Sequence, residues 1–204
     1  MTYKIIGDSC LDLTEELKRD PRFQMVPLTL QVGAAQVVDD ETFDQKAFIR
    51  MVKECPECPK TACPSPEIFK EAYEAADAEA VFVITLSSHL SGSYNSAALA
   101  KQLYEDEMKE KGIESSKKIE VLDSESASAG QLEQALYIRD LCEQGLNFEE
   151  VVEKLRKFRD EMHTYFVLES LDTLRKNGRL SGLQAIRPGK RYQQGASENV
   201  RYCH

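Results

Sequence analysis

The sequence predicts an α/β fold with a parallel sheet in three layers, because short apolar segments alternate with segments of helical periodicity. Three of the apolar segments end in a small polar pair and lead into a helical segment. These pairs are Asp8-Ser9, Ser87-Ser88 and Asp123-Ser124. Strand–helix crossovers make neighbouring strands parallel. We therefore expect a three-layer N-terminal domain, followed by the start of a second α/β domain.

The sequence of the first quarter of the chain predicts three strands, the last two of them forming a hairpin, and two helices. Apolar segment 3–7 forms the first strand, and Thr14 begins a helix. Segment 24–32 alternates between apolar and polar residues, which predicts one strand with 35–39 as its hairpin partner. The helical spacing of apolar residues then predicts a helix over 44–52.

A proline-rich loop follows this hairpin. Ser65 is suited to cap a helix, because Pro66 fits the first helical position. Thr61 lies earlier, where we expect a loop and no helix start that uses its hydroxyl. A loop hydroxyl is usually solvated, so Thr61 is a candidate binding residue only if it faces the same ligand as Ser91 or Ser93.

Segment 80–86 and the turn after it are the most informative part of the sequence. The run is rich in branched apolar residues and predicts a strand that is covered on both faces. Ser91-Gly92-Ser93 then opens a long helix. A helix start has unpaired N–H groups and the positive end of the helix dipole, and a glycine lets a ligand approach the backbone. The turn is therefore a candidate site for a phosphate or a carboxylate.

Strand 118–122 and a helix within 126–142 repeat the same pattern. Ligands of an open parallel sheet bind at the carboxyl ends of the strands, so the polar pairs should gather at one edge. Any one pair is most simply a turn former or a helix cap. Three pairs at a common edge favour a ligand site, with Ser9 and Ser124 at its rim.

Charge and composition exclude several classes of protein. The net charge of -9 and the pI near 5.0 argue against nucleic-acid binding, which needs a basic face. No apolar stretch approaches the length of a membrane span, so we expect no stable membrane insertion and only transient contact with a membrane surface. The expected location is the cytoplasm.

The six cysteines do not follow the spacing of a metal site. Cys55, Cys58 and Cys63 lie close together, but a closed zinc site usually needs two ligand pairs, and Cys203 is at the far end of the chain. A thioredoxin-like CxxC would open a helix after a strand, which this one does not. We expect no metal, and we expect the other two cysteines, Cys10 and Cys142, to be small core residues.

Six segments, taken together and in order, match a known family. They are Gly7-Asp8-Ser9-Cys10-Leu11-Asp12-Leu13, Val26-Pro27-Leu28, Lys60-Thr61-Ala62-Cys63-Pro64-Ser65-Pro66, Leu90-Ser91-Gly92-Ser93, Val121-Leu122-Asp123-Ser124 with 126–130, and the segment 171–181. Through them, residues 3 to about 183 resemble the DegV family of bacterial fatty-acid-binding proteins, the acyl carriers of fatty acid kinase.

The resemblance implies the EDD fold and a long-chain fatty acid as ligand, with no cofactor. Its carboxylate would be held by Thr61 and by Ser91 or Ser93, in keeping with the anion site that the residues around Gly92 predict. The protein would not be an enzyme, and no catalytic residues are implied. It would present the acid to the catalytic subunit of a fatty acid kinase, which makes acyl phosphate for phospholipid synthesis.

Beyond the middle of the chain, the sequence departs from the family pattern. We expect an N-terminal domain over 1–160, the beginning of an incomplete lipid-binding domain over 161–185 and a disordered tail over 186–204. The family has a late His at the carboxylate site, and none of the three histidines matches it. His89 and His163 are expected to face solvent, and the third is His204. Leu28, Leu30, Phe166 and Leu168 are weak candidates for lining the acyl tunnel.

Two other functions remain open at this point. Ser91 or Ser93 could be the nucleophile of a hydrolase, because each follows a strand. The sequence lacks the Gly-x-Ser-x-Gly elbow and shows no evident Ser-His-Asp set. The chain could also be a non-functional fragment of a carrier.

Overall fold

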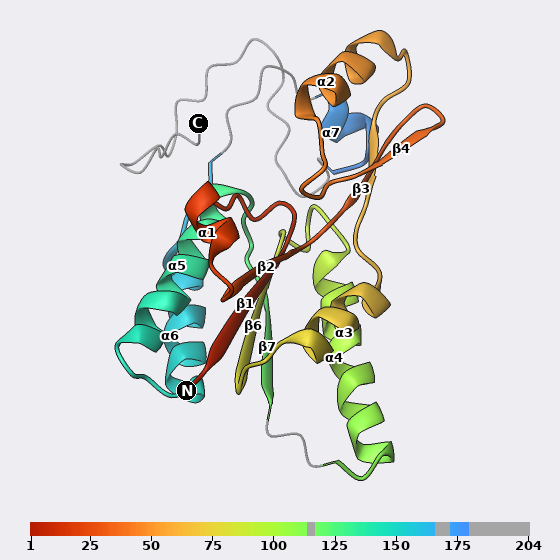
Figure 1. Ribbon diagram of the computed structural model, residues 1–204. Coiled ribbons are helices and arrows are strands. Elements are labelled where there is room, and N and C mark those ends of the chain that lie inside the picture. The colour runs from red at the N-terminus through yellow and green to blue at the C-terminus, as the bar shows by residue number, and fades with distance from the viewer. Residues whose placement is uncertain (114–116, 166–171, 180–204) are drawn as a thin grey trace.

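The computed structural model describes residues 1–113, 117–165 and 172–179. Its larger sheet has four parallel strands in the order β2-β1-β6-β7 (Figure 1). These strands are β1 (Tyr3–Asp8), β2 (Phe23–Val26), β6 (Ala80–Thr85) and β7 (Lys118–Asp123). The strands predicted at 3–7, 80–86 and 118–122 are thus confirmed, and the α/β class with them.

Helices cover both faces of this sheet (Figure 1). On one face lie α1 (Glu15–Arg19), α5 (Ala129–Glu143) and α6 (Phe148–Glu161), and on the other lie α3 (Pro66–Ala75) and α4 (Ser93–Glu110). Alternate residues of β6 enter the two cores: Phe82 packs on the α5 side and Val83 on the α4 side. This alternation explains why β6 is buried along its whole length, and it confirms the three-layer prediction.

A second sheet extends from the first. Its three antiparallel strands, in the order β4-β3-β5, are β3 (Thr29–Val32), β4 (Ala35–Val38) and β5 (Lys60–Ala62). Helix α2 (Gln45–Glu54) connects β4 to β5, and none of its residues is buried. In Figure 1 this extension projects beyond the carboxyl ends of the parallel strands.

Two expectations about this region are wrong. Segment 24–32 is not one strand, because Pro27 separates β2 of the parallel sheet from β3 of the antiparallel sheet. Proline has no N–H to donate to a strand ladder, so it marks the change of partner. Thr61 does not lie in a loop. It lies in β5 and is paired with Leu30 of β3.

The predicted helix starts are largely as expected. The Thr14 hydroxyl accepts the N–H of Leu17, and Asp44 caps α2 in the same way through the N–H of Ala47. Ser65 occupies the N-cap position of α3, but its side chain makes no capping hydrogen bond to the helix backbone.

Several expectations fall outside the described residues. They concern Phe166, Leu168, Cys203, His204 and the tail over 186–204, and the domain boundaries remain predictions. The short helix α7 (Asp172–Lys176) is described, and Asn177 just after it donates to the backbone oxygen of Pro59 at 3.1 Å. Within the described ranges, no helix is both long and apolar enough to span a membrane.

Candidate functional site

The polar residues at the strand ends meet at one edge of the parallel sheet. The N–H of Leu86, just after β6, donates to Asp8 Oδ2 at the end of β1, at 2.7 Å. The N–H of Ser88 donates to Asp123 Oδ1 at the end of β7, at 3.0 Å. The expected common edge is therefore present, and its carboxylates fix the turn that leads from β6 into α4.

The chain also changes the face on which it crosses over at this edge. The chain leaves β1 and crosses to β2 through α1 on one face, whereas it leaves β6 and crosses to β7 through α4 on the opposite face. The adjacent strands β1 and β6 are therefore a switch point, where open α/β sheets bind their ligands. The Ser91-Gly92-Ser93 turn follows one of these two strands.

Helix α4 starts with a small, open turn. Gly92 is its N-cap residue and is exposed, and no cap side chain hydrogen-bonds to the first turn. The two flanking hydroxyl oxygens, of Ser91 and Ser93, lie 3.0 Å apart, and the N–H of Ser93 donates to Ser91 Oγ at 3.2 Å. The helix dipole and the backbone N–H groups make this turn favourable for an anionic oxygen.

The segment that carries Thr61 reaches the same helix start through Cys63. A Cβ added at Gly92 would lie 3.1 Å from Cys63 Sγ, and this sulfur lies 3.7 Å from Ser96 Oγ. Thr61 is exposed, two residues before this contact. Within the described ranges, no hydrogen bond joins Thr61 to Ser91, so the structure brings the two segments together without linking these hydroxyls directly.

Arg179 is a site residue that the sequence analysis missed. Its Nη2 donates to Thr61 Oγ1 at 2.8 Å. Its charge also lowers the pKa of the Cys10 thiol, although burial outweighs this effect and raises that pKa to about 12. The guanidinium therefore lies between β5 and the end of β1. Arg179 lies in the segment 171–181 that matches the family pattern. Its positive charge in that segment is the sequence feature that could have indicated an anionic ligand.

The side chains of Ser9 and Ser124, expected at the rim of the site, already form hydrogen bonds within the protein. Ser9 Oγ donates to Asp39 Oδ2 at 2.7 Å and accepts the N–H of Leu28 at 3.1 Å. Ser124 is 1% exposed, and its hydroxyl bonds to both the oxygen and the N–H of Ser126 at 3.1 Å. Both side chains therefore stabilise loops, and their part in ligand binding stays a prediction.

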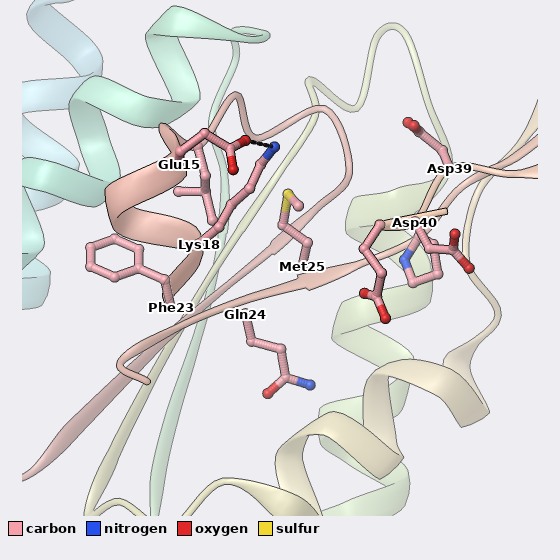
Figure 2. Close-up of a pocket in the computed structure, with 10 residues that line it drawn as sticks. Glu15, Lys18, Phe23, Gln24, Met25, Asp39 and Asp40 are labelled. Carbon is pink, nitrogen blue, oxygen red and sulfur yellow. Dashed lines mark hydrogen bonds and ion pairs between the residues drawn. The ribbon is translucent and has the colours of Figure 1, made fainter. Parts of the chain in front are cut away.

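Two adjoining cavities, of about 560 and 590 Å³, lie on the other side of β1, over β2 and the start of α1. Both are lined by Leu13, Lys18 and Met25 and by Asp39 and Asp40. Figure 2 shows one of them, with Asp39 and Asp40 at one side. The lining of both mixes apolar side chains with charged ones, and its acidic side disfavours a carboxylate. No local sequence pattern predicts these cavities.

The remaining candidates differ in exposure. His89 and His163 are both exposed, as expected. Leu28 is buried and Leu30 is half-buried. Cys10 and Cys142 are half-buried rather than fully buried core residues. In the described part of the chain, no three His, Cys, Asp or Glu side chains are grouped to hold a metal ion.

A family model described as "Uncharacterised protein, DegV family" matches residues 2–187. The chain belongs to the DegV family. A curated DegV domain-containing protein of Streptococcus pneumoniae is 39% identical over 186 residues, which are 90% of this chain and 63% of the relative. The chain thus spans less than two thirds of the length of this DegV relative.

Solved DegV structures share the fold. A DegV family protein of Ruminococcus gnavus, refined with vaccenic acid, has 47% identity and a TM-score of 0.84, over 91% of this chain and 64% of its own. The Fatty Acid Kinase (Fak) B3 protein of Streptococcus pneumoniae, loaded with linoleic acid, has 39% identity and a TM-score of 0.78, over 90% of this chain and 63% of its own.

Proposed function

We propose that this chain binds a long-chain fatty acid and presents its carboxylate to a separate kinase, which forms the acyl phosphate. The observation that carries the proposal is the α4 start, where an exposed glycine lies between two hydroxyls. Fatty acids are held by two DegV structures that match about nine tenths of this chain, which supports the choice of ligand.

Four residues would hold the carboxylate. Thr61, Ser91 and Ser93 would supply hydroxyls, and Gly92 an accessible backbone. Arg179 adds a positive charge next to Thr61. Hydroxyl and backbone donors orient a carboxylate without covalent attachment, so the acid stays able to react or leave.

The reaction itself would belong to the partner. The name of the Streptococcus pneumoniae relative, a Fatty Acid Kinase B protein, supports a kinase as that partner. We propose that the chain is a cytoplasmic carrier and not an enzyme. With kinase and ATP, acyl phosphate should form when the carrier is present and should be absent when either protein is omitted.

Extraction of the purified chain with organic solvent, followed by mass spectrometry, tests the proposal. We expect a long-chain fatty acid at close to one per chain. The Thr61→Ala/Ser91→Ala double variant, purified in parallel, should retain less. A folded chain that carries no fatty acid, and takes up none when it is added, would contradict the proposal.

A serine hydrolase is the second candidate function, and no observation in the structure favours it. Among the described residues, no His side chain hydrogen-bonds to Ser91 or Ser93, and both described histidines are exposed. We expect any turnover of an activated ester to be unchanged in Ser91→Ala and Ser93→Ala. A cooperative unfolding transition together with bound lipid would dismiss the third possibility, a non-functional fragment.

A further inference from the structure

The turn that follows α7 is attached to the start of β5 at two points. The side-chain amide of Asn177 donates to the backbone oxygen of Pro59 at 3.1 Å and to Cys58 Sγ at 3.7 Å. Two residues further on, Arg179 Nη2 donates to Thr61 Oγ1 at 2.8 Å. Asn177 and Arg179 are spaced along the chain as Pro59 and Thr61 are, so the two contacts align this turn with β5.

Gly178 provides the backbone conformation of the turn. Its φ is +69°, in the left-handed region that favours glycine, and its N–H donates to the oxygen of Arg175 at 3.1 Å. The N–H of Asn177 donates to the oxygen of Thr173 at 3.1 Å, so the helix closes directly before this glycine. The residues on either side of Gly178 are therefore the two that reach β5.

The contact made by Asn177 matters because α7 cannot hold its own position. The helix has five residues, and isolated helices of that length are unstable in water. Arg179 has a long side chain, which loses much rotamer freedom when it is fixed. Its partner Thr61 is exposed and belongs to a three-residue strand. The hydrogen bond from Asn177 to Pro59 supplies a second point of attachment close to this hydroxyl.

We infer that Asn177 is a positioning residue: it holds the end of α7 on the start of β5, and so keeps the Arg179 guanidinium at Thr61, where the ligand carboxylate would bind. This inference rests on the proposed function and deepens it, because it names the residue that places the positive charge of the site. Asn177 acts through Arg179 and does not touch the ligand. The guanidinium is always protonated, so its effect on the carboxylate depends on where it is held.

The test compares a fatty acid with its methyl ester, using the 204-residue chain. The ratio of the two affinities is the head-group preference. Arg179→Ala should reduce this preference about tenfold, because a charged partner of the carboxylate is lost. Asn177→Ala should reduce it about threefold, the scale of one neutral hydrogen bond. Asn177→Ala should add little to Arg179→Ala, since the group that Asn177 positions is then absent.

Two further variants separate the donor group of Asn177 from its size. Asn177→Gln keeps the amide N–H, one methylene further out, and should retain more of the head-group preference than Asn177→Ala. Asn177→Asp keeps the size but has no N–H to donate to the Pro59 oxygen at neutral pH, and its charge can draw Arg179 away from Thr61. It should therefore cost more preference than Asn177→Ala. A role in folding alone would not produce this order.

Asn147→Ala is the matched control. Asn147 caps α6 by accepting the N–H of Glu150 at 3.0 Å. This variant should lower the free energy of unfolding and leave the head-group preference unchanged. The attachment of α7 can also be followed without ligand, because the Asn177 amide contacts Cys58 Sγ. Iodoacetamide should alkylate Cys58 faster in Asn177→Ala than in the unchanged chain or in Asn147→Ala.

The outcomes separate the inference from the proposed function. The inference is overturned if Asn177→Ala leaves the head-group preference unchanged, or if its effect adds in full to that of Arg179→Ala. An unchanged rate of alkylation at Cys58 would show that Asn177 does not hold the turn there, and would overturn the inference as well. An unchanged chain that binds acid and ester equally, or neither, would overturn the proposed function itself.

Discussion

At the scale of single residues, two glycines allow loops to pack against the ends of neighbouring elements. A Cβ on Gly7 would lie 2.5 Å from Leu11 Cδ2, and one on Gly130 would lie 2.9 Å from Ser126 Cβ. Each glycine precedes one partner of a buried hydrogen bond, in which the Gln131 side-chain amide donates to Asp8 Oδ1 at 3.1 Å. The packing that needs these glycines therefore also places this carboxylate and this amide.

Gly130→Ala should destabilise the chain by about 1–3 kcal/mol, the usual cost of overpacking, although alanine is the better helix former. Urea unfolding followed by circular dichroism measures this loss. Ser126→Gly, which removes the atoms in the way, should recover part of it when the two changes are combined. The hypothesis of a close approach fails if the combined variant is no more stable than Gly130→Ala alone.

Thr61→Ala together with Ser91→Ala should weaken fatty-acid binding by roughly 1–3 kcal/mol, because hydrogen bonds to a charged group are lost. Isothermal titration calorimetry measures the change. The methyl ester of the same acid should be far less sensitive to the double variant. Equal losses for acid and ester would contradict a head-group site at these hydroxyls.

At the scale of elements, segments that keep one pattern and one sheet were predictable, whereas a change of sheet within a segment and a three-residue strand were not. The buried strand 80–85 and the helix after Gly92 were clear because each carries one sustained pattern. Segment 24–32 keeps a single alternation across Pro27, and only the pairing partners of its two halves show that they belong to different sheets. Strand β5 has three residues, too few for any periodicity.

Helices α3 and α4 are joined by charges around Glu107. Hydrogen bonds from Lys111 and Lys70 lower the pKa of Glu107 from 4.5 to about 2. A carboxyl group whose pKa is lowered by folding stabilises the fold at pH values above its unfolded-state pKa. This contribution is lost as the pH falls through the folded-state pKa. Glu107→Gln should therefore lower the free energy of unfolding at neutral pH. The variant should also lose less of this free energy than the unchanged chain as the pH falls from 4.5 to 2.

Urea unfolding at a series of pH values measures this effect, with Glu110→Gln, a change in the exposed last turn of α4, as the control. Because Lys111 is exposed and Glu107 and Lys70 are partly exposed, 0.5 M salt should weaken the effect by screening. If the free energy of unfolding falls equally below pH 4.5 in the unchanged chain and in Glu107→Gln, Glu107 does not contribute to that loss.

At the scale of the whole molecule, the proposed site lies between two sheets of unequal packing. The two large apolar clusters take their strand residues from the parallel sheet, whereas α2 of the extension has no buried residue. Ser91 follows the parallel strand β6, and Thr61 belongs to antiparallel β5. A ligand held by both would connect the less stable part of the protein to the more stable one.

Hydrogen exchange with mass spectrometry should show this difference. We expect amides of β3, β4 and β5 to exchange through a local opening, while those of β1 and β6 exchange only with global unfolding. A bound fatty acid should slow exchange in β5 more than in β2, which carries none of the proposed head-group residues. Equal protection of the two sheets without ligand would contradict the prediction.

The site was predictable where it is local in sequence and not where it depends on tertiary contacts. Ser91-Gly92-Ser93 were found because a strand-to-helix turn is visible in the sequence itself. The pairing of Arg179 with Thr61 joins residues that are 118 positions apart. The network of Asp8 with Gln131 spans 123 positions. No local pattern encodes such pairs, because the sheet order and the paths of the loops bring them together.

The contact between Cys63 and the α4 start has a practical consequence. Cys63 is a free, half-buried thiol whose sulfur faces Gly92. A fatty acid seated on this turn should shield the thiol, so the rate at which iodoacetamide alkylates Cys63 becomes a readout of occupancy. Peptide mapping separates this cysteine from Cys58, which lies before β5 and serves as the internal reference. The protein thus carries its own covalent reporter of ligand binding, without an added label.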